Sequence, residues 1–121
     1  MENRAKIANT SDAELFVSIH MNKIPQEKYS GWQTFYKEND DKSKKLASHI
    51  QNNLNSSIQS NNTRQIKPLP NIYLSKHINI PFALVECGFL SNTSESKLLS
   101  TDYYQSKLAW GIYSGILDYF E

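Results

Sequence analysis

The segment PFALVEC, residues 81–87, constrains the possible folds more than any other part of the chain. Its mostly apolar run is typical of a buried strand, and the proline that opens it is tolerated at the start or the edge of a strand. The run reaches one acid, Glu86, near its end. A carboxylate in such a place costs free energy unless another group pairs with its charge or uses it.

Strand and helix patterns alternate along the rest of the chain, which predicts an α/β fold with a mixed, largely parallel sheet flanked by helices. Asn92 and Asp102 are expected to cap the two helices that follow them. The predicted elements are a helix end over 2–9, strands over 15–22, 32–36, 72–76 and 81–87, helices over 41–59, 91–99 and from 102 onward, and a loop with two prolines over 61–71.

Length and composition indicate one globular domain or part of one, because 39% of the 121 residues are hydrophobic and 21% are charged. The 13 basic and 12 acidic residues nearly balance, which argues against a nucleic-acid partner. Cys87 is the only cysteine, so an internal disulfide and a Cys-rich zinc site are excluded. No apolar run reaches membrane-spanning length, and the first residues lack the apolar core of a signal peptide.

Two polar residues near the ends of predicted strands are the candidates for chemistry. His20 lies near the end of LFVSIHMN, and Glu86 lies near the end of PFALVEC. In open α/β sheets, functional sites gather beyond the carboxyl ends of the strands. Imidazole is a common zinc ligand, and a carboxylate can take a proton from a bound water and deliver it to a leaving amine.

Each of these residues also has a plain structural explanation. A His at a strand end is often a hydrogen-bonded core or rim residue, and Glu86 could equally cap the next helix or pair with Arg64. Cys87 points to the opposite face from Glu86 by strand alternation, and a free Cys is commonly a small buried hydrophobe. A Cys87–His20 pair would instead suit a cysteine hydrolase.

Six segments carry a resemblance to a known family, and they follow one another as SIHMN, GWQTFY, SKKLASHIQ, NTRQIKPLPNIYLSK, PFALVECGFLSN and YQSKLAWGIYSGILDYF. Together they resemble the zinc-dependent N-acetylmuramoyl-L-alanine amidases of the amidase_3 family, over essentially the whole chain. Within that family, the chain is most similar to the germination-specific members that act on the spore cortex. The combination of SIH-x-N with VECGFLSN is the most specific part of the resemblance.

The resemblance implies hydrolysis of the peptidoglycan amide between N-acetylmuramic acid and L-alanine. His20 matches a zinc ligand of the family and Glu86 matches its catalytic acid/base, while Asn22, Arg64 and Asn92 are expected to contact the substrate. The family also implies action outside the cytoplasm, in spore cortex maturation through muramic-δ-lactam formation and in germination. For some members it implies a lipoprotein partner.

The chain departs from the family pattern at its amino-terminal end. The family's other His ligand, in a Gly-His-Gly-Gly-like turn, and its Glu ligand have no match. Residues 1–121 therefore resemble the C-terminal larger part of a single catalytic domain that lacks its first strand and the segment after it. We expect weak or absent zinc binding by the chain alone, and self-association through the sheet edge that would be left open.

Three kinds of function are consistent with these residues. The first is a zinc-dependent amidase, the second is an inactive remnant or peptidoglycan-binding module, and the third is a cysteine hydrolase. A common cleft for His20 and Glu86 would favour the first. Should the two side chains lie on opposite faces of the sheet, the amidase interpretation would fail.

Overall fold

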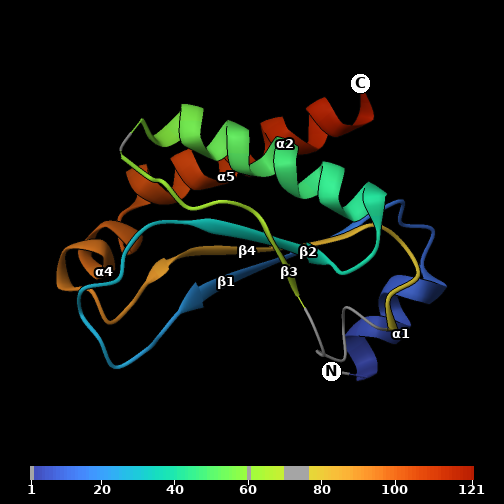
Figure 1. Cartoon of the computed structure of the whole chain (residues 1–121), viewed down its shortest axis with the longest axis horizontal. Coiled ribbons are helices and arrows are strands. Elements are labelled where there is room, and N and C mark those ends of the chain that lie inside the picture. The colour runs from blue at the N-terminus through green and yellow to red at the C-terminus, as the bar shows by residue number, and fades with distance from the viewer. Residues whose placement is uncertain (1, 60, 70–76) are drawn as a thin grey trace.

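The computed structural model describes residues 2–59, 61–69 and 77–121, in which helices and strands alternate (Figure 1). In chain order the elements are α1 (Glu2–Thr10), β1 (Phe16–Asn22), β2 (Gln33–Lys37), α2 (Asp41–Ile58), β3 (Lys67–Leu69), β4 (Phe82–Phe89), α4 (Thr93–Leu99) and α5 (Asp102–Phe120). The start of α2 is fixed by Asp40, whose side chain accepts a hydrogen bond from Ser43 N. Its apolar stripe then supplies one buried face.

The described strands form one mixed sheet in the order β1-β4-β2-β3. β4 lies in the interior, with β1 parallel on one side and β2 antiparallel on the other, and β3 pairs parallel with β2. All residues of β4 except Glu86 are buried, which agrees with the apolar run seen in the sequence. The predicted mixed, largely parallel sheet flanked by helices is therefore confirmed.

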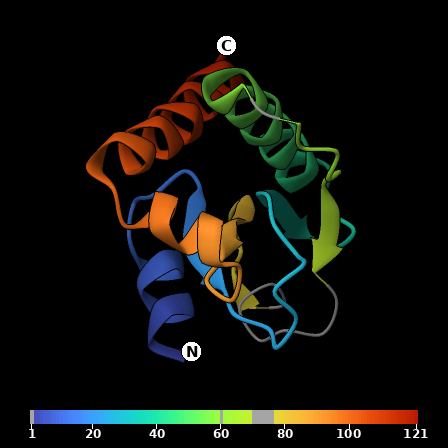
Figure 2. The same cartoon turned by 90° about the vertical axis from the view of Figure 1, so that its left-hand side faces the viewer.

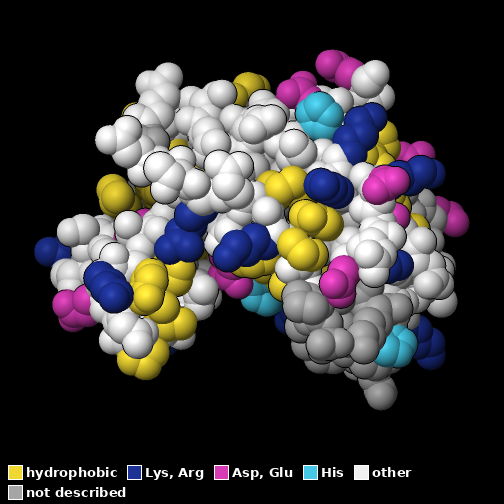
Figure 3. Space-filling model, in the orientation of Figure 1, with side chains coloured by type: hydrophobic (Ala, Val, Ile, Leu, Met, Phe, Trp, Pro, Cys, Tyr) yellow, Lys and Arg dark blue, Asp and Glu magenta, His cyan; other side chains and the backbone are white. Residues whose placement is uncertain are grey.

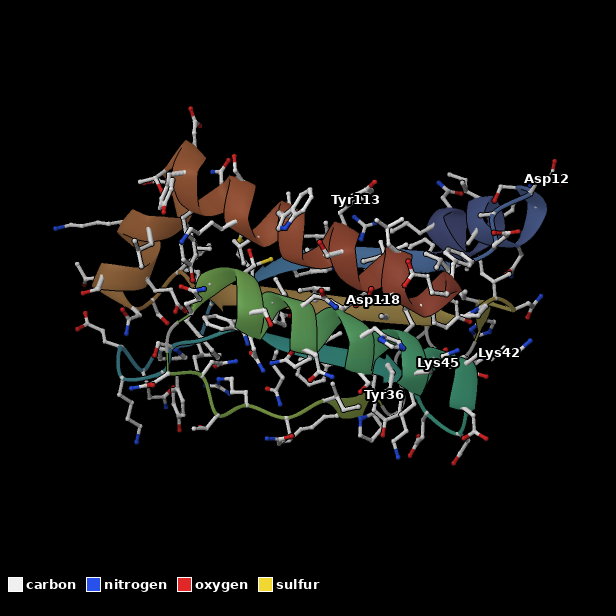
Figure 4. The ribbon with its side chains drawn as sticks, turned by 90° about the horizontal axis from the view of Figure 1, so that it is seen from above. Asp12, Tyr36, Lys42, Lys45, Tyr113 and Asp118 are labelled. Atoms are coloured by element: carbon white, nitrogen blue, oxygen red, sulfur yellow. The ribbon has the colours of Figure 1, made fainter. Side chains whose placement is uncertain are left out.

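Helices α2 and α5 cover one face of the sheet, as Figures 1 and 2 show. They lie side by side and run in opposite directions (Figure 4), with Asp118 on the side of α5 that faces α2 and Tyr113 pointing away from it. The two helices approach closely at Gly115, where an added Cβ would lie 2.5 Å from Ile50 Cα. The core between them and the sheet contains Trp32, Leu46, Ala47, Ile50, Leu54, Ala83, Val85, Cys87, Leu99, Tyr104, Leu108 and Ile112.

The opposite face of the sheet is covered at one end. Ala5 and Ala8 of α1 pack with Phe82 and Leu84, near the amino end of β4. Figure 1 shows α1 beneath that end of the sheet, away from the carboxyl ends of β1 and β4. The face beside the carboxyl ends is therefore the part of the sheet at which a site can form.

Most predicted elements are confirmed to within a few residues, and two predictions are wrong. The loop predicted over 61–71 contains strand β3, in which Pro68 is tolerated because β3 is one of the two edge strands of the described sheet. The cap of α5 is Thr101, whose side chain accepts from Tyr104 N, whereas Asp102 is the first helical residue. The strand predicted over 72–76 lies outside the described residues. None of the described helices combines the length and the apolar character needed to cross a bilayer.

Candidate active site

His20 and Glu86 lie side by side at the carboxyl ends of β1 and β4. They are partners in the parallel register of the two strands, and partners in register project from the same face of a sheet. Val85 and Cys87 belong to the core under α2 and α5, so Glu86 projects from the other, partly open face. The structure thus brings together the two residues that the amidase interpretation requires, while their chemical roles stay predictions.

Burial and the neighbouring imidazole set the acid–base properties of Glu86. Ser18 Oγ and His20 Nε2 lie 2.7 Å apart, so a hydrogen bond along β1 holds the imidazole. Glu86 Oε2 is buried and has no hydrogen-bond partner among the described residues. Burial raises the pKa of the Glu86 carboxyl, and the nearby His20 acts in the opposite direction. A carboxyl whose pKa is raised in this way is suited to both take up and release a proton.

Gln33 continues this row of side chains onto β2, because it is the antiparallel partner of Glu86. Gln33 also lines a groove of about 780 Å³, which lies between residues 28–33 and residues 61–67. In the space-filling view, Lys and Arg side chains lie just above a recess in which a His and an acidic side chain are visible (Figure 3). The site is therefore bordered by a groove with a basic lining.

Arg64 lies in this groove and is held by contacts on three sides. Its Nε donates to Ser30 O at 2.9 Å, and its Nη1 donates to Gln33 Oε1 at 3.4 Å. The guanidinium carbon lies 4.8 Å from the ring centroid of Phe89. No carboxylate of the described residues forms an ion pair with Arg64, so the suggested pairing with Glu86 does not occur there.

Asn92 is engaged within the fold. Its Oδ1 accepts from Glu95 N and so caps α4, as predicted, and its Nδ2 donates to Glu27 O. In the same turn, Leu90 N donates to Asn22 O. These contacts fix the turn that follows β4, and substrate contact by Asn22 and Asn92 stays a prediction.

Glu95 is a structural residue of the site that sequence reasoning missed. Its side chain is 7% exposed, Oε1 accepts from Phe89 N at 2.6 Å and Oε2 accepts from Gly31 N at 2.7 Å. A Cβ at Gly88 would lie 2.7 Å from Glu95 Oε1, so glycine leaves room for the carboxylate. The sequence predicted only the cap at Asn92 in this turn, because local spacing does not reveal which distant backbone groups a side chain reaches.

Comparison with known proteins decides the family. The family model "Amidase_3: N-acetylmuramoyl-L-alanine amidase" matches residues 1–118. The chain belongs to the Amidase_3 family. The germination-specific N-acetylmuramoyl-L-alanine amidase of Bacillus subtilis is 46% identical over 120 residues, which cover 99% of this chain and 50% of that relative.

Solved structures of Amidase_3 proteins agree with this assignment. The CwlD amidase of Clostridioides difficile, solved in complex with the GerS lipoprotein, is 49% identical with a TM-score of 0.94, over 98% of this chain and 60% of that one. An N-acetylmuramoyl-L-alanine amidase of Clostridium difficile 630 is 33% identical with a TM-score of 0.90, over 98% of this chain and 64% of that one. The fold expected from the resemblance is confirmed, and the chain spans about half the length of the curated relative described above.

Cys87 is placed unfavourably for nucleophilic chemistry in this Amidase_3 chain. It lies on the face of β4 opposite Glu86, in the core under α2 and α5, and is 1% exposed. Burial, and then the charge of Glu86, raises the pKa of the Cys87 thiol to about 12. The alternative of a Cys87–His20 pair is therefore disfavoured, because His20 projects from the other face.

Zinc is the metal that the Amidase_3 family implies, and the described residues fit only part of a zinc site. Catalytic zinc is usually held by three protein ligands. His20 offers an imidazole and Glu86 an unsatisfied carboxylate oxygen. Within residues 2–59, 61–69 and 77–121, no cluster of three or more His, Cys, Asp or Glu side chains could hold a metal ion. One imidazole and one carboxylate do not make a complete site.

Proposed function

We propose that this chain is the C-terminal larger part of a single Amidase_3 catalytic domain that hydrolyses the amide between N-acetylmuramic acid and L-alanine in peptidoglycan. The pairing of His20 with Glu86 in register, on the partly open face of the sheet, is the observation that supports this most directly. The unsatisfied Oε2 of Glu86 adds to it, because a buried acceptor without a partner is costly unless it is used.

In this proposal Glu86 moves the proton that the reaction requires. As a carboxylate it accepts a proton from the water that attacks the amide carbonyl, and it then delivers that proton to the departing nitrogen of L-alanine. The carboxylate is restored in each turnover, and the nitrogen leaves as a neutral amine. Partial burial supports both steps because it brings the two protonation states of Glu86 closer in free energy.

We further propose that His20 is a zinc ligand in the complete protein, and that residues 1–121 alone bind zinc weakly or not at all. A single imidazole supplies only part of the affinity of a catalytic site. Calorimetric titration of the chain with zinc should show no tight stoichiometric binding. Tight one-to-one zinc binding would contradict the proposal. If that binding were lost in the His20→Ala variant, the ion would be located at His20.

The relatives support a biological setting. The name of the Bacillus subtilis relative links it to germination, and we propose that this chain acts outside the cytoplasm on the spore cortex, where amide hydrolysis precedes muramic-δ-lactam formation. CwlD was solved with the GerS lipoprotein, which supports a lipoprotein partner here as well.

The activity is tested by replacing the matching region of the Bacillus subtilis relative with residues 1–121. We expect this chimera to release peptides with a free L-alanine amino group from purified peptidoglycan, measured by mass spectrometry. Glu86→Gln should lower the rate by about 10²–10⁴-fold, the usual size of a general acid–base contribution. Cys87→Ser is the control and should retain activity. A Glu86→Gln chimera as active as its parent would overturn the role of Glu86.

A second candidate function is an inactive peptidoglycan-binding module. The incomplete set of metal ligands among the described residues favours it. Co-sedimentation of the chain with purified peptidoglycan measures the binding directly. Retained binding together with an inactive parent chimera would favour the module over the enzyme.

A further inference from the structure

We propose that the basic groove beside Glu86 binds the peptide arm of the substrate, and that Arg64 receives a carboxylate of that peptide. This inference rests on the proposed function, because it takes the scissile amide to lie at Glu86. It adds the direction in which the substrate lies, and it names the substrate group that Arg64 recognises.

The groove begins where the row of site residues ends. His20, Glu86 and Gln33 occupy neighbouring strands in one register row. Gln33 Nε2 donates to Gln65 O at 2.6 Å, and Arg64 Nη1 donates back to Gln33 Oε1. Arg64 therefore lies about two strand spacings from Glu86, which is roughly 10 Å. An extended peptide spans that distance with about three residues.

The charges that line the groove select an anion. Among the residues that the structure describes, Lys28, Arg64 and Lys67 line it, and Glu95 is the one acidic lining residue. The Glu95 carboxylate is directed towards two backbone N–H groups, and it forms no ion pair with these bases among the described residues. No ion pair involving the three cations occurs in the part of the chain that the structure describes. A ligand carboxylate would supply the missing counter-charge.

Arg64 is held in place before any ligand arrives. Contacts to Ser30 O, Gln33 Oε1 and the Phe89 ring fix its guanidinium. Its backbone oxygen accepts from Gln51 Nε2 at 3.2 Å, and the Gln51 side chain is buried. A guanidinium held in this way loses little conformational entropy when its remaining N–H groups bind a carboxylate.

The anion selected in this way lies on the peptide side of the scissile bond. N-acetylated sugars carry no charge, and the lactyl carboxyl of muramic acid is tied up in the amide itself. The peptide, in contrast, carries free carboxylates on residues beyond L-alanine. A carboxylate two or three residues from the amide would reach Arg64, with the glycan extending in the other direction.

The test compares two peptides that differ only in charge. One is N-acetyl-L-alanyl-γ-D-glutamyl-L-lysine, and the other is the same peptide with both carboxyl groups converted to amides. NMR titration of the 121-residue chain should show that the acid binds about ten-fold or more tightly, since hydrogen bonds between charged groups contribute on that scale. The backbone amides of Gly31 and Arg64 should shift on binding.

Variants of the groove assign the effect to Arg64. Arg64→Ala should bring the acid-to-amide affinity ratio close to one, while Arg64→Lys should keep part of it, because the charge remains and the fork is lost. Lys44→Ala, an exposed cation on α2, is the matched control and should leave the ratio unchanged. Dispersed spectra of each variant show that it is folded.

Three results would overturn the inference. They are equal binding of the acid and amide peptides, an unchanged ratio in Arg64→Ala, and displacement of the acid peptide by inorganic phosphate at the same concentration, which indicates a general anion site. If the chimera is active but binds the acid and amide peptides equally, only the proposed role of the groove is refuted. If the chimera is inactive but still binds the acid peptide more tightly than the amide peptide, the proposed amidase activity is refuted. The groove would then remain as a peptide-binding site.

Discussion

Glu86 is held where its ionised form is unfavourable, and this makes the stability of the chain depend on pH. Burial raises its pKa above the ordinary value of 4.5. In the window between that value and the raised one, the folded state binds more protons than the unfolded state, so stability falls as the pH rises. Glu86→Gln removes this cost, and the metal-free variant should be more stable than the wild type at neutral pH.

Urea unfolding at a series of pH values measures this effect. The stability difference between Glu86→Gln and the wild type should shrink as the pH falls below 4.5, because both side chains are then neutral in both states. Glu38→Gln, at an exposed position, serves as the control and should show no such trend. A Glu86→Gln variant less stable than the wild type at neutral pH would contradict the prediction.

The Cys87 thiol should be unreactive towards thiol reagents in the folded chain. Its thiol is buried and its pKa is raised to about 12, so hardly any thiolate is present at pH 8. A thiol reagent such as DTNB should react slowly with the native chain and at once in denaturant. Rapid reaction in the native state would show that the packing around Cys87 is looser than described.

The sequence predicted the residues of the central pair better than the residues around it. His20 and Glu86 could be placed together because strand alternation and the carboxyl-end rule need only local patterns. Gln33 joins their row through the register between β2 and β4, which no local pattern specifies. The same holds for the contact between Glu95 and Gly31, which lie 64 residues apart in the sequence.

At the scale of elements, Glu95 joins α4 to the end of β4 and to the loop before β2. Glu95→Ala would leave Phe89 N and Gly31 N without their acceptor, and we expect a loss of about 3 kcal/mol in unfolding free energy. Urea unfolding measures the loss, and hydrogen exchange should show the two amides less protected. Glu38→Ala, at an exposed position, should change neither quantity. Unchanged protection of both amides would contradict the contacts described.

The contact between α2 and α5 depends on small residues. Gly115→Ala adds a methyl group 2.5 Å from Ile50 Cα, so the helices must separate, at a cost of about 1–3 kcal/mol. Ser106→Ala, at an exposed position of α5, is the control and should be neutral or slightly stabilising. Thermal unfolding distinguishes the two, and a Gly115→Ala variant as stable as the control would argue against close helix packing.

The helices and strands that were predicted correctly depend on local sequence patterns. The predictions that failed depend on strand pairing or on the backbone conformation. The stripe on α2 and the apolar run of β4 are local signals, and both elements occur as predicted. β3 was missed because KPL carries no strand pattern and becomes a strand only by pairing with Phe35, Tyr36 and Lys37. The cap at Thr101 was missed because two adjacent residues could both cap, and only the backbone decides between them.

At the scale of the whole molecule, the outer edge of β1 is the surface at which we propose self-association. β1 has no strand on its outer side in the described sheet, and its Ile19 is 58% exposed. Light scattering with size-exclusion chromatography should show a mass that rises with concentration. Ile19→Lys should reduce this association by placing a charge on the edge, whereas Ile7→Lys on α1 should not. A monomer at all concentrations would refute the proposal.

The interior position of β4 also has a consequence for the synthesis of the protein on the ribosome. In the described sheet, strand β1, complete at Asn22, pairs with β4, which ends at Phe89. At ~5–20 residues per second, a ribosome takes on the order of several seconds to make the intervening chain. During that interval the side of β1 that pairs with β4 is open, so the nascent polypeptide should be a client for chaperones at the exit tunnel.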